Sequence, residues 1–177
     1  MIEVLKSTEK VAQKSRHVRI NPEALIAAVR RMVAEEIVIP PWDGCHHFFD
    51  GGRKTVAYFL VLDTVNFCFW APEGECRWEI DFEGRKISGY YALAAALKKA
   101  FEEDRPIIGA EDLARLSGDD LRNILGGTGE LQMMDQRAAN LKELGGFLLD
   151  KCEGDACNLV EAAGRSAVAL AGLLAER

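Results

Sequence analysis

Imidazole, carboxylate, thiol and aromatic side chains gather in one short stretch, residues 43–50, with the sequence DGCHHFFD. Such a cluster could hold a metal ion, or it could form the edge of a pocket for a flat ligand. We expect no metal, because adjacent side chains of an extended chain point to opposite sides and no second ligand cluster occurs elsewhere. The remaining interpretations are a pocket edge, contributed by His47 and Phe49, or a loop that plugs the core.

A single carboxylate interrupts the apolar stretch TVAYFLVLDTVNFCFW, residues 55–70. An element that is apolar on every face is buried, and a buried carboxylate is unfavourable unless it is paired or hydrogen-bonded. Asp63 and Asn66 are three residues apart, so a helix would place them on one face. The sequence leaves two roles open for Asp63: a member of a structural network, or an acceptor of hydrogen bonds from a polar ligand.

Other motifs are less specific. Aromatic residues between positions 70 and 91 could line a pocket or cap a core; they are Trp70, Trp78, Tyr90 and Tyr91. The run GGTG at residues 126–129 follows no predicted strand and lacks the context of a phosphate-binding loop, so it indicates the end of a helix. No Ser-His-Asp arrangement and no zinc-protease motif occurs in the sequence.

The elements that must position these residues are mostly helical. Asn21-Pro22 predicts a helix start, and apolar residues from Leu25 to Val33 predict a core-facing stripe that ends at Ile39-Pro40-Pro41. Residues 55–70 predict a buried helix that becomes extended near its end, and residues 77–87 predict a hairpin. Further helices are predicted over 90–103, 117–126, 131–151 and 155–176, the last broken at Gly164. The fold class is therefore mainly α with a small β-hairpin.

Length and composition indicate one domain over residues 1–177 with an ordinary core. The net charge of −6 argues against a surface that tracks nucleic-acid phosphates. No 18-residue apolar run predicts a membrane span, and the first 20 residues lack the apolar region of a secretory signal. Five cysteines without CxxC spacing indicate a reduced, cytoplasmic protein.

Several strings together resemble one family. They are the opening VAQKSRHVRINPEAL, HHFFDGG, LVLDTVNFCFW, RWEID, GYYALAAALKKA, EDLARLSGDDLRNILGGTGEL and NLVEAAGRSAV. Over residues 3–175 they are similar to the queuosine salvage proteins. The resemblance implies a helical fold like that of DNA glycosylases. It also implies hydrolysis of the N-glycosidic bond of queuosine 5′-phosphate to queuine and ribose 5-phosphate, without a cofactor. The implied partner is this small nucleotide or queuine itself, with no intact nucleic acid and no membrane.

The family continues beyond the length of this chain, with a KRAQ-like stretch and an acidic FADY-like motif that are expected to supply phosphate contact and the catalytic carboxylate. The resemblance therefore implies that residues 1–177 form the N-terminal portion of a longer glycosidase domain. The catalytic residue stays unknown, with Asp63 as a candidate. The expected base-holding residues are His47, Asp63 and Asn66, and the expected stacking or packing residues are Phe49, Phe67, Trp70 and Tyr91.

Two alternatives stay open beside hydrolysis. The chain could bind a nucleobase or nucleotide without turnover, or it could be a structural half that needs a C-terminal partner segment. Exposed apolar surface around residues 159–174 would favour the second of these.

Overall fold

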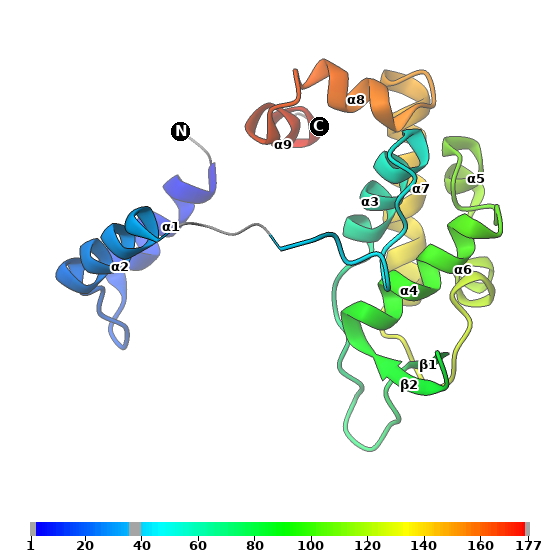
Figure 1. Cartoon of the computed structure of the whole chain (residues 1–177), viewed down its shortest axis with the longest axis horizontal. Helices are drawn as coiled ribbons and strands as arrows, with labels where there is room; N and C mark the ends of the chain where they lie inside the picture. The colour runs from blue at the N-terminus through cyan, green and yellow to red at the C-terminus, as the bar shows by residue number, and fades with distance from the viewer. Residues whose placement is uncertain (1–2, 36–39, 176–177) are drawn as a thin grey trace. The chain divides into compact units, whose positions relative to one another are not determined.

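A computed structural model describes residues 3–35 and 40–175, which form nine helices and one hairpin (Figure 1). The chain divides into two compact units, Met1–Trp42 and Asp43–Arg177. The predicted fold class, mainly α with a small β-hairpin, is confirmed.

The first unit contains helices α1 (Glu3–Lys14) and α2 (Pro22–Ala34). The predicted start of α2 is confirmed, because the Asn21 side chain accepts a hydrogen bond from the Ala24 N–H at 3.1 Å and Pro22 occupies the first turn. The helix ends at Ala34, before the predicted stop. Ile39 of that stop lies outside the described residues.

The apolar stripe of α2 does not face a core. Its five large side chains are 49–81% exposed, and no residue of the helix is buried: Leu25, Ile26, Val29, Met32 and Val33. The prediction of a core-facing stripe is therefore wrong for this structure. A helix face is buried only against a second layer, and within this unit two short helices supply none that covers it.

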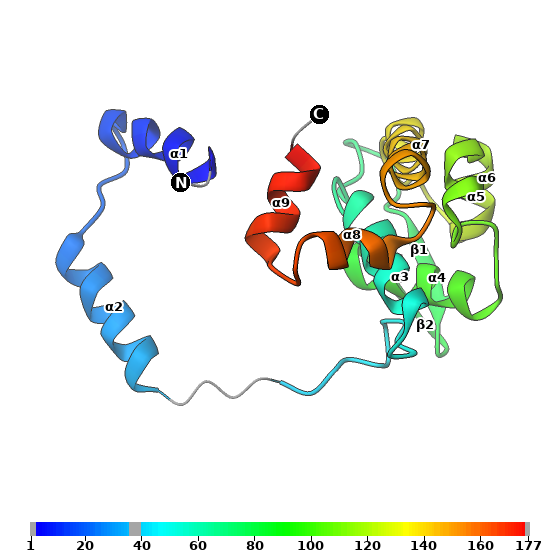
Figure 2. The same ribbon diagram turned by 90° about the horizontal axis from the view of Figure 1, so that it is seen from above.

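The second unit holds the remaining elements in chain order (Figures 1 and 2). They are α3 (Arg53–Thr64), β1 (Glu79–Phe82), β2 (Arg85–Ser88), α4 (Gly89–Glu102), α5 (Ala110–Arg115), α6 (Gly118–Leu125), α7 (Met134–Lys151), α8 (Ala156–Ala162) and α9 (Ala167–Ala175). The predicted helices are confirmed to within a few residues, whereas α5 was not predicted as an element of its own.

The core of this unit is built by helices α3 to α8, with α3 packed on α4 and α8, and α7 packed on α5 and α6. Tyr58 of α3 is fully buried beside Phe101 of α4, with the two rings edge to face at 5.4 Å. The Tyr58 hydroxyl donates a hydrogen bond to the Ala94 carbonyl at 3.0 Å, which ties α3 to α4. Burial raises the pKa of the Tyr58 phenol, so the group stays a donor. These contacts give α3 one fixed position.

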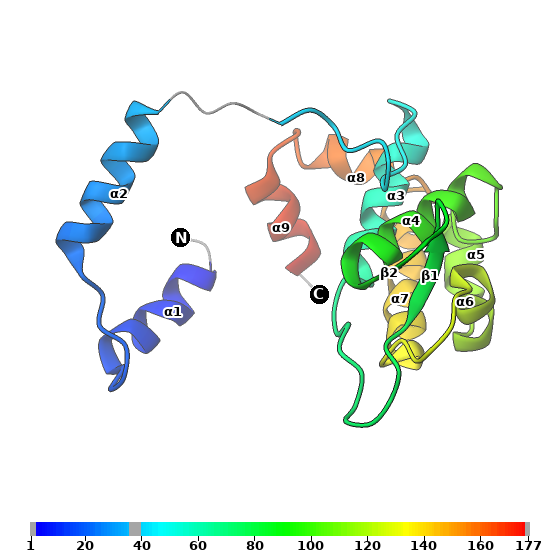
Figure 3. The ribbon, with the colours of Figure 1, turned by 60° about the horizontal axis from the view of Figure 1, so that its bottom comes forward.

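The hairpin pairs β1 with β2 in antiparallel register, from Glu79 opposite Ser88 to Phe82 opposite Arg85. Glu83 and Gly84 both have positive φ, 48° and 74°, as the tight hairpin turn requires. Figure 3 shows the hairpin lying along α4, at the far end of the long loop that leaves α3. The predicted hairpin is confirmed.

Helices α5 and α7 pack closely because of Gly145. A Cβ atom there would lie 2.5 Å from the Ala114 nitrogen and 2.7 Å from the Ala110 carbonyl oxygen, so a side chain would push the two helices apart. The start of α6 follows from the S-x-x-D spacing of Ser117 and Asp120, which form a reciprocal capping box.

The predicted break between the last two helices is confirmed. Gly164 and Arg165 have positive φ, and the Ser166 hydroxyl accepts a hydrogen bond from the Ala169 N–H at 3.3 Å. No residue of α9 is buried. Among the residues that the structure describes, no single helix is long and apolar enough to cross a membrane; α8 and α9 pass that test only as a pair, which is bent by 112°.

Candidate functional site

The segment of residues 43–52, here called the histidine loop, begins with a turn around Asp43. One carboxylate oxygen of Asp43 accepts from the Cys45 N–H at 3.1 Å, and the other lies 3.0 Å from Nδ1 of His46. Nδ1 of His47 lies 3.1 Å from the Asp43 carbonyl oxygen. Both imidazoles thus bond to the same residue. The expectation that they point to opposite sides is wrong, because the segment is a turn and not extended.

The His47 ring is fixed at both nitrogens. A carbonyl only accepts, so Nδ1 carries the proton in its bond to Asp43. In the neutral ring, Nε2 then accepts from the Tyr90 hydroxyl, 2.8 Å away at the start of α4. The ring also stacks against Phe59 of α3, with centroids 6.4 Å apart. His47 therefore links the loop to both α3 and α4.

Further hydrogen bonds close the histidine loop at each end. The Lys98 ammonium of α4 donates to the carbonyls of Gly44 and Cys45, at 2.6 and 3.1 Å. Asp50 accepts from the Gly52 N–H and the Thr55 hydroxyl, both at 2.7 Å. These bonds lower the pKa of the Asp50 carboxyl, that from Thr55 most strongly, and the bond from the His46 ring likewise lowers that of Asp43.

Asp63 stands in the last turn of α3, one turn after Phe59, so the two share a helix face. Its side chain is exposed to solvent, which corrects the expectation of a buried carboxylate. The surrounding groups still desolvate it enough to raise its pKa. Burial raises the pKa of Tyr90, and the negative charge of Asp63 adds to this, so the carboxylate lies within electrostatic range of the Tyr90–His47 pair.

The segment of residues 65–69, here called the phenylalanine loop, follows α3. Because α3 ends at Thr64, Asn66 lies beyond the helix, and the helical argument that put it on a face with Asp63 is wrong. Asn66 is exposed and Phe67 is half-buried. The loop is held by Arg137 of α7, whose side-chain N–H groups donate to the carbonyls of Val65, Phe67 and Cys68.

The remaining candidate residues are aromatic and more exposed: Tyr91, Phe49 and Trp70. Tyr91 stacks at a tilt on His46, with centroids 4.8 Å apart, and is otherwise half-exposed. Phe49 and Trp70 are 61% and 68% exposed. The structure therefore places His47 against Tyr90 and Phe59, with Asp63 one turn further along α3 from Phe59. It attaches Tyr91 through His46, puts Asn66 and Phe67 in the loop that follows α3, and leaves the Phe49 and Trp70 rings at the surface.

Sequence reasoning singled out no role for three residues that organise the site: Phe59, Lys98 and Arg137. Phe59 could have been found from its four-residue spacing to Asp63. Lys98 resembles any solvated lysine on an amphipathic helix, and Arg137 sits in a helix whose other face is charged. Nothing local in the sequence indicates that these two reach backbone carbonyls 53 to 72 residues away.

One group of donors could in principle hold a cation. Asp43, Cys45 and His46 offer ligand atoms that all lie within 4.8 Å of one another. The Asp43 carboxylate is already engaged by the His46 ring and by backbone N–H groups. The Lys98 ammonium lies against the neighbouring carbonyls, and a positive charge there disfavours a second cation. These contacts favour a hydrogen-bonded turn.

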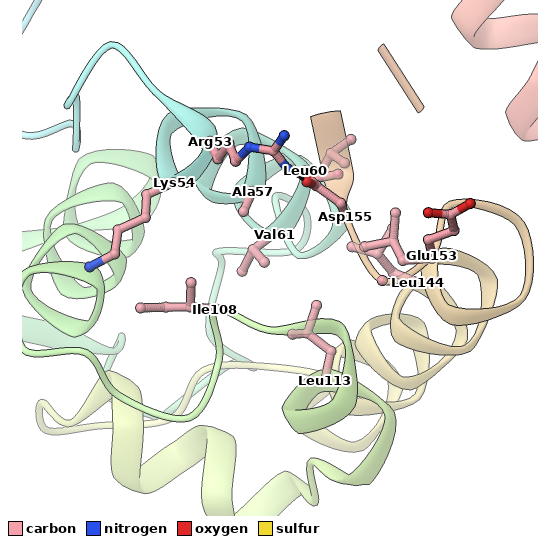
Figure 4. Close-up of a pocket in the computed structure, with 13 residues that line it drawn as sticks. Arg53, Lys54, Ala57, Leu60, Val61, Ile108, Leu113, Leu144, Glu153 and Asp155 are labelled. Carbon is pink, nitrogen blue, oxygen red and sulfur yellow. Dashed lines mark ion pairs between the residues drawn. The ribbon is translucent and has the colours of Figure 1, made fainter. Parts of the chain in front are cut away.

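A separate pocket of about 280 Å³ lies between α3, α5, α7 and α8 (Figure 4). Its floor is apolar, with Ala57, Val61 and Leu113 among the lining residues. At its rim Arg53 forms an ion pair with Asp155, and Lys54 forms one with Asp104. None of the seven candidate base-site residues lines it. This pocket and the Asp63 site are distinct.

The geometry at Asp63 suits a polar, flat ligand. A carboxylate accepts hydrogen bonds, and the His47–Tyr90 pair, stacked on Phe59 one turn before Asp63, adds an oriented imidazole and phenol. A carboxylate of this kind can also stabilise a cationic sugar.

Comparison with known proteins shows the family of this chain. A model of the family described as "Queuosine salvage protein" matches residues 46–177. The chain belongs to the queuosine salvage protein family. Over 97% of its length it is 39% identical to a Sphaerobacter thermophilus protein named queuosine 5′-phosphate N-glycosylase/hydrolase. Over 96% of its length it is 31% identical to proteins of the same name from Bos taurus and Mus musculus.

The chain spans about half the length of these curated relatives, 52% of each. The part matched by the queuosine salvage model contains all seven candidate residues, whereas the matches to the relatives also take in most of the first unit. Both loops at Asp63 thus lie in the shared part of the family.

Proposed function

We propose that this chain acts in the hydrolysis of the N-glycosidic bond of queuosine 5′-phosphate, which releases queuine and ribose 5-phosphate. The observation that carries the proposal is the family match over residues 46–177, together with relatives named for this reaction. The ligand is the small nucleotide and not intact transfer RNA, which the acidic net charge of −6 supports. The five unpaired cysteines support a reduced compartment, the cytoplasm.

In this proposal the Asp63 site holds the departing base. Asp63 and Asn66 accept and donate hydrogen bonds at the edge of the base. Both ring nitrogens of His47 are engaged by Asp43 and Tyr90, so His47 contributes by orienting the Tyr90 hydroxyl, whose oxygen can still accept a hydrogen bond. Phe67 and Tyr91 offer ring faces for stacking, with Phe49 and Trp70 at the rim. The base leaves with the electron pair of the glycosidic bond, so hydrogen-bond donors such as the Asn66 amide make it a better leaving group by stabilising its negative charge, while the Asp63 carboxylate serves to hold and orient it.

The sugar needs a second contribution. Cleavage passes through a cation on the ribose, which a nearby carboxylate stabilises while water attacks. Asp63 is a candidate for this carboxylate, but in the described structure it is exposed, and electrostatic stabilisation is weak in contact with water. Because the chain covers about half the length of its relatives, we expect the part of the family outside residues 1–177 to supply a carboxylate and the phosphate contact.

The experiment is a queuine-release assay with queuosine 5′-phosphate. It compares the 177-residue chain alone with the chain supplemented by the C-terminal half of a relative. We expect little release by the chain alone and clear release from the mixture. Robust turnover by the chain alone would make Asp63 the leading catalytic candidate. No release in either case, from folded protein that binds its supplement, would refute the proposal.

A second function is favoured by one observation at the C-terminal end of the described chain. Val168 of α9 is 61% exposed, and Leu170, Leu173 and Leu174 reach the core only in part. Such an apolar helix fits a structural half completed by a partner segment. The same mixture tests this, because a complementing half should co-elute with the chain on size exclusion even if no queuine is released.

A further inference from the structure

Arg137, in the first turns of α7, is the one charged side chain that is buried in the described part of the chain, with no exposed surface. A buried charge normally has a partner of opposite sign. Arg137 forms no ion pair with a described carboxylate. Its partners are four backbone carbonyls instead: those of Gln132, Val65, Phe67 and Cys68. Only the first belongs to its own segment of the chain.

Two aromatic faces complete its surroundings. The guanidinium carbon lies 4.4 Å from the centre of the Phe67 ring and 5.5 Å from that of Phe69. Carbonyl oxygens and ring faces both present negative charge density, so together they replace the missing carboxylate. Burial lowers the pKa of Arg137 to about 10, which leaves the group protonated at neutral pH. The charge is thus used entirely on one segment, the phenylalanine loop.

The backbone of that loop is not relaxed. Cys68 has a φ of 48°, in the left-handed region that side-chain-bearing residues rarely adopt. Arg137 bonds to the carbonyls on either side of this position, those of Phe67 and Cys68, with one nitrogen, Nη2. The same guanidinium therefore holds the strained residue in place.

We propose that Arg137 is a positioning residue: by bonding to the carbonyls of residues 65, 67 and 68, it sets the conformation of the phenylalanine loop and through it the orientation of Asn66 and Phe67 toward the base. The inference rests on the proposed function for the identity of the ligand. A planar fork with five N–H groups is needed, because three carbonyls lie around it and two rings stack on it. Lysine keeps the charge but cannot make that set of contacts.

The test compares Arg137→Lys with a control on the same helix, Leu148→Ala. Leu148 is buried, lies three turns along α7 and lines the separate pocket of Figure 4, so its loss destabilises the unit without touching the loop. Each variant of the 177-residue chain is measured at a temperature that lies the same number of degrees below its own melting temperature. Amide hydrogen exchange is then measured residue by residue. The Phe67 N–H, which donates to the Val65 carbonyl at 3.1 Å, is the local probe.

We expect exchange at residues 66–69 to rise selectively in Arg137→Lys, by roughly tenfold over the control, because one anchoring contact set is lost there. Queuosine 5′-phosphate affinity, measured by calorimetry, should fall by a similar factor in Arg137→Lys and stay unchanged in Leu148→Ala. Equal loop exchange in the two variants would overturn the inference, as would selective loop exchange with unchanged affinity. Failure of the wild-type chain to bind the nucleotide would instead refute the proposed function, and the exchange comparison would still decide whether Arg137 holds the loop.

Discussion

The two loops that flank Asp63 are held in opposite ways. The histidine loop is held by several partly exposed groups, with Asp43, Asp50, Tyr90 and Lys98 each contributing to its hydrogen bonds. The phenylalanine loop depends on one buried cation, Arg137, which makes three hydrogen bonds to it and stacks on two of its rings. The histidine loop is thus held by contacts from several residues, whereas the side-chain contacts that hold the phenylalanine loop come from Arg137. We call the first kind of support shared and the second concentrated.

The difference shows that burial determines how much stability is lost when a hydrogen bond is removed. A half-exposed carbonyl that loses its donor can bond to water, so each contact of the histidine loop contributes little by itself. A carbonyl that faces the buried guanidinium has no water to replace it. The loops should therefore respond very differently to single substitutions and to acid.

The largest effect is expected from Arg137→Met. Methionine fills part of the volume but removes the guanidinium donor from four carbonyls, of which only that of Val65 keeps a backbone donor in its own loop, so the free energy of unfolding should fall by about 3 kcal/mol. Chemical denaturation measures this, with Lys142→Met, an exposed position on the same helix, as the control. A loss below roughly 1 kcal/mol would mean that the carbonyls find water and that support of this loop is not concentrated.

The next effect concerns Asp63, the residue between the loops. Asp63→Asn should weaken binding of queuine by roughly 1.5–3 kcal/mol, because a charged acceptor is replaced by a neutral one. Stability should hardly change, since the carboxylate is exposed and forms no described ion pair. Calorimetry and thermal melting measure the two quantities in one preparation. A sharp drop in melting temperature with normal binding would assign Asp63 to a structural network.

A smaller effect is expected from Lys98→Met, which removes two hydrogen bonds to the histidine loop. The free energy of unfolding should fall by about 1 kcal/mol or less, because Tyr90 and Asp43 still hold the loop. Lys99→Met, one position along and exposed, is the control. A loss as large as that of Arg137→Met would show that the support is not shared after all.

The smallest effect is expected from acid. Hydrogen bonds lower the pKa of Asp43 and Asp50 below the ordinary 3.8, so their stabilisation is present above pH 3.8 and is lost as the pH falls through the lowered values. The raised pKa of Asp63 acts in the other direction: protonation relieves its desolvation, so this group favours the folded state as the pH falls toward 3.8. Hydrogen exchange should therefore rise in the histidine loop below pH 3.8, while the phenylalanine loop stays protected. Loss of protection from hydrogen exchange in both loops over the same pH range would contradict the proposed difference in how the two loops are held.

The fold was predictable from sequence wherever a local rule decides it. Asn21-Pro22 begins a helix, Glu83-Gly84 forms the hairpin turn, Ser117 with Asp120 caps α6, and Gly164 breaks the last helical stretch. Each depends on the hydrogen bonds or backbone angles of its own few residues. Apolar periodicity was less reliable. It identifies the apolar face of α2, but it does not show whether another element packs against that face.

The candidate site was predictable in part. The family strings indicated the region, and His47 does contact α3 at Phe59, one turn before Asp63. The exposure of Asp63 and the place of Asn66 beyond the helix could not be predicted, because both depend on where α3 ends. Arg137 escaped notice for a different reason. Its partners are backbone carbonyls, and backbone carbonyls carry no sequence signal.

The central claim is that the two loops and Asp63 form a base site, and titration calorimetry with queuine, compared with guanine, tests it most directly. The folded 177-residue chain should bind queuine, should bind guanine more weakly, and should lose its queuine affinity in Asp63→Asn. Equal binding of the two bases, or binding of neither by a sample with an intact melting transition, would contradict the account.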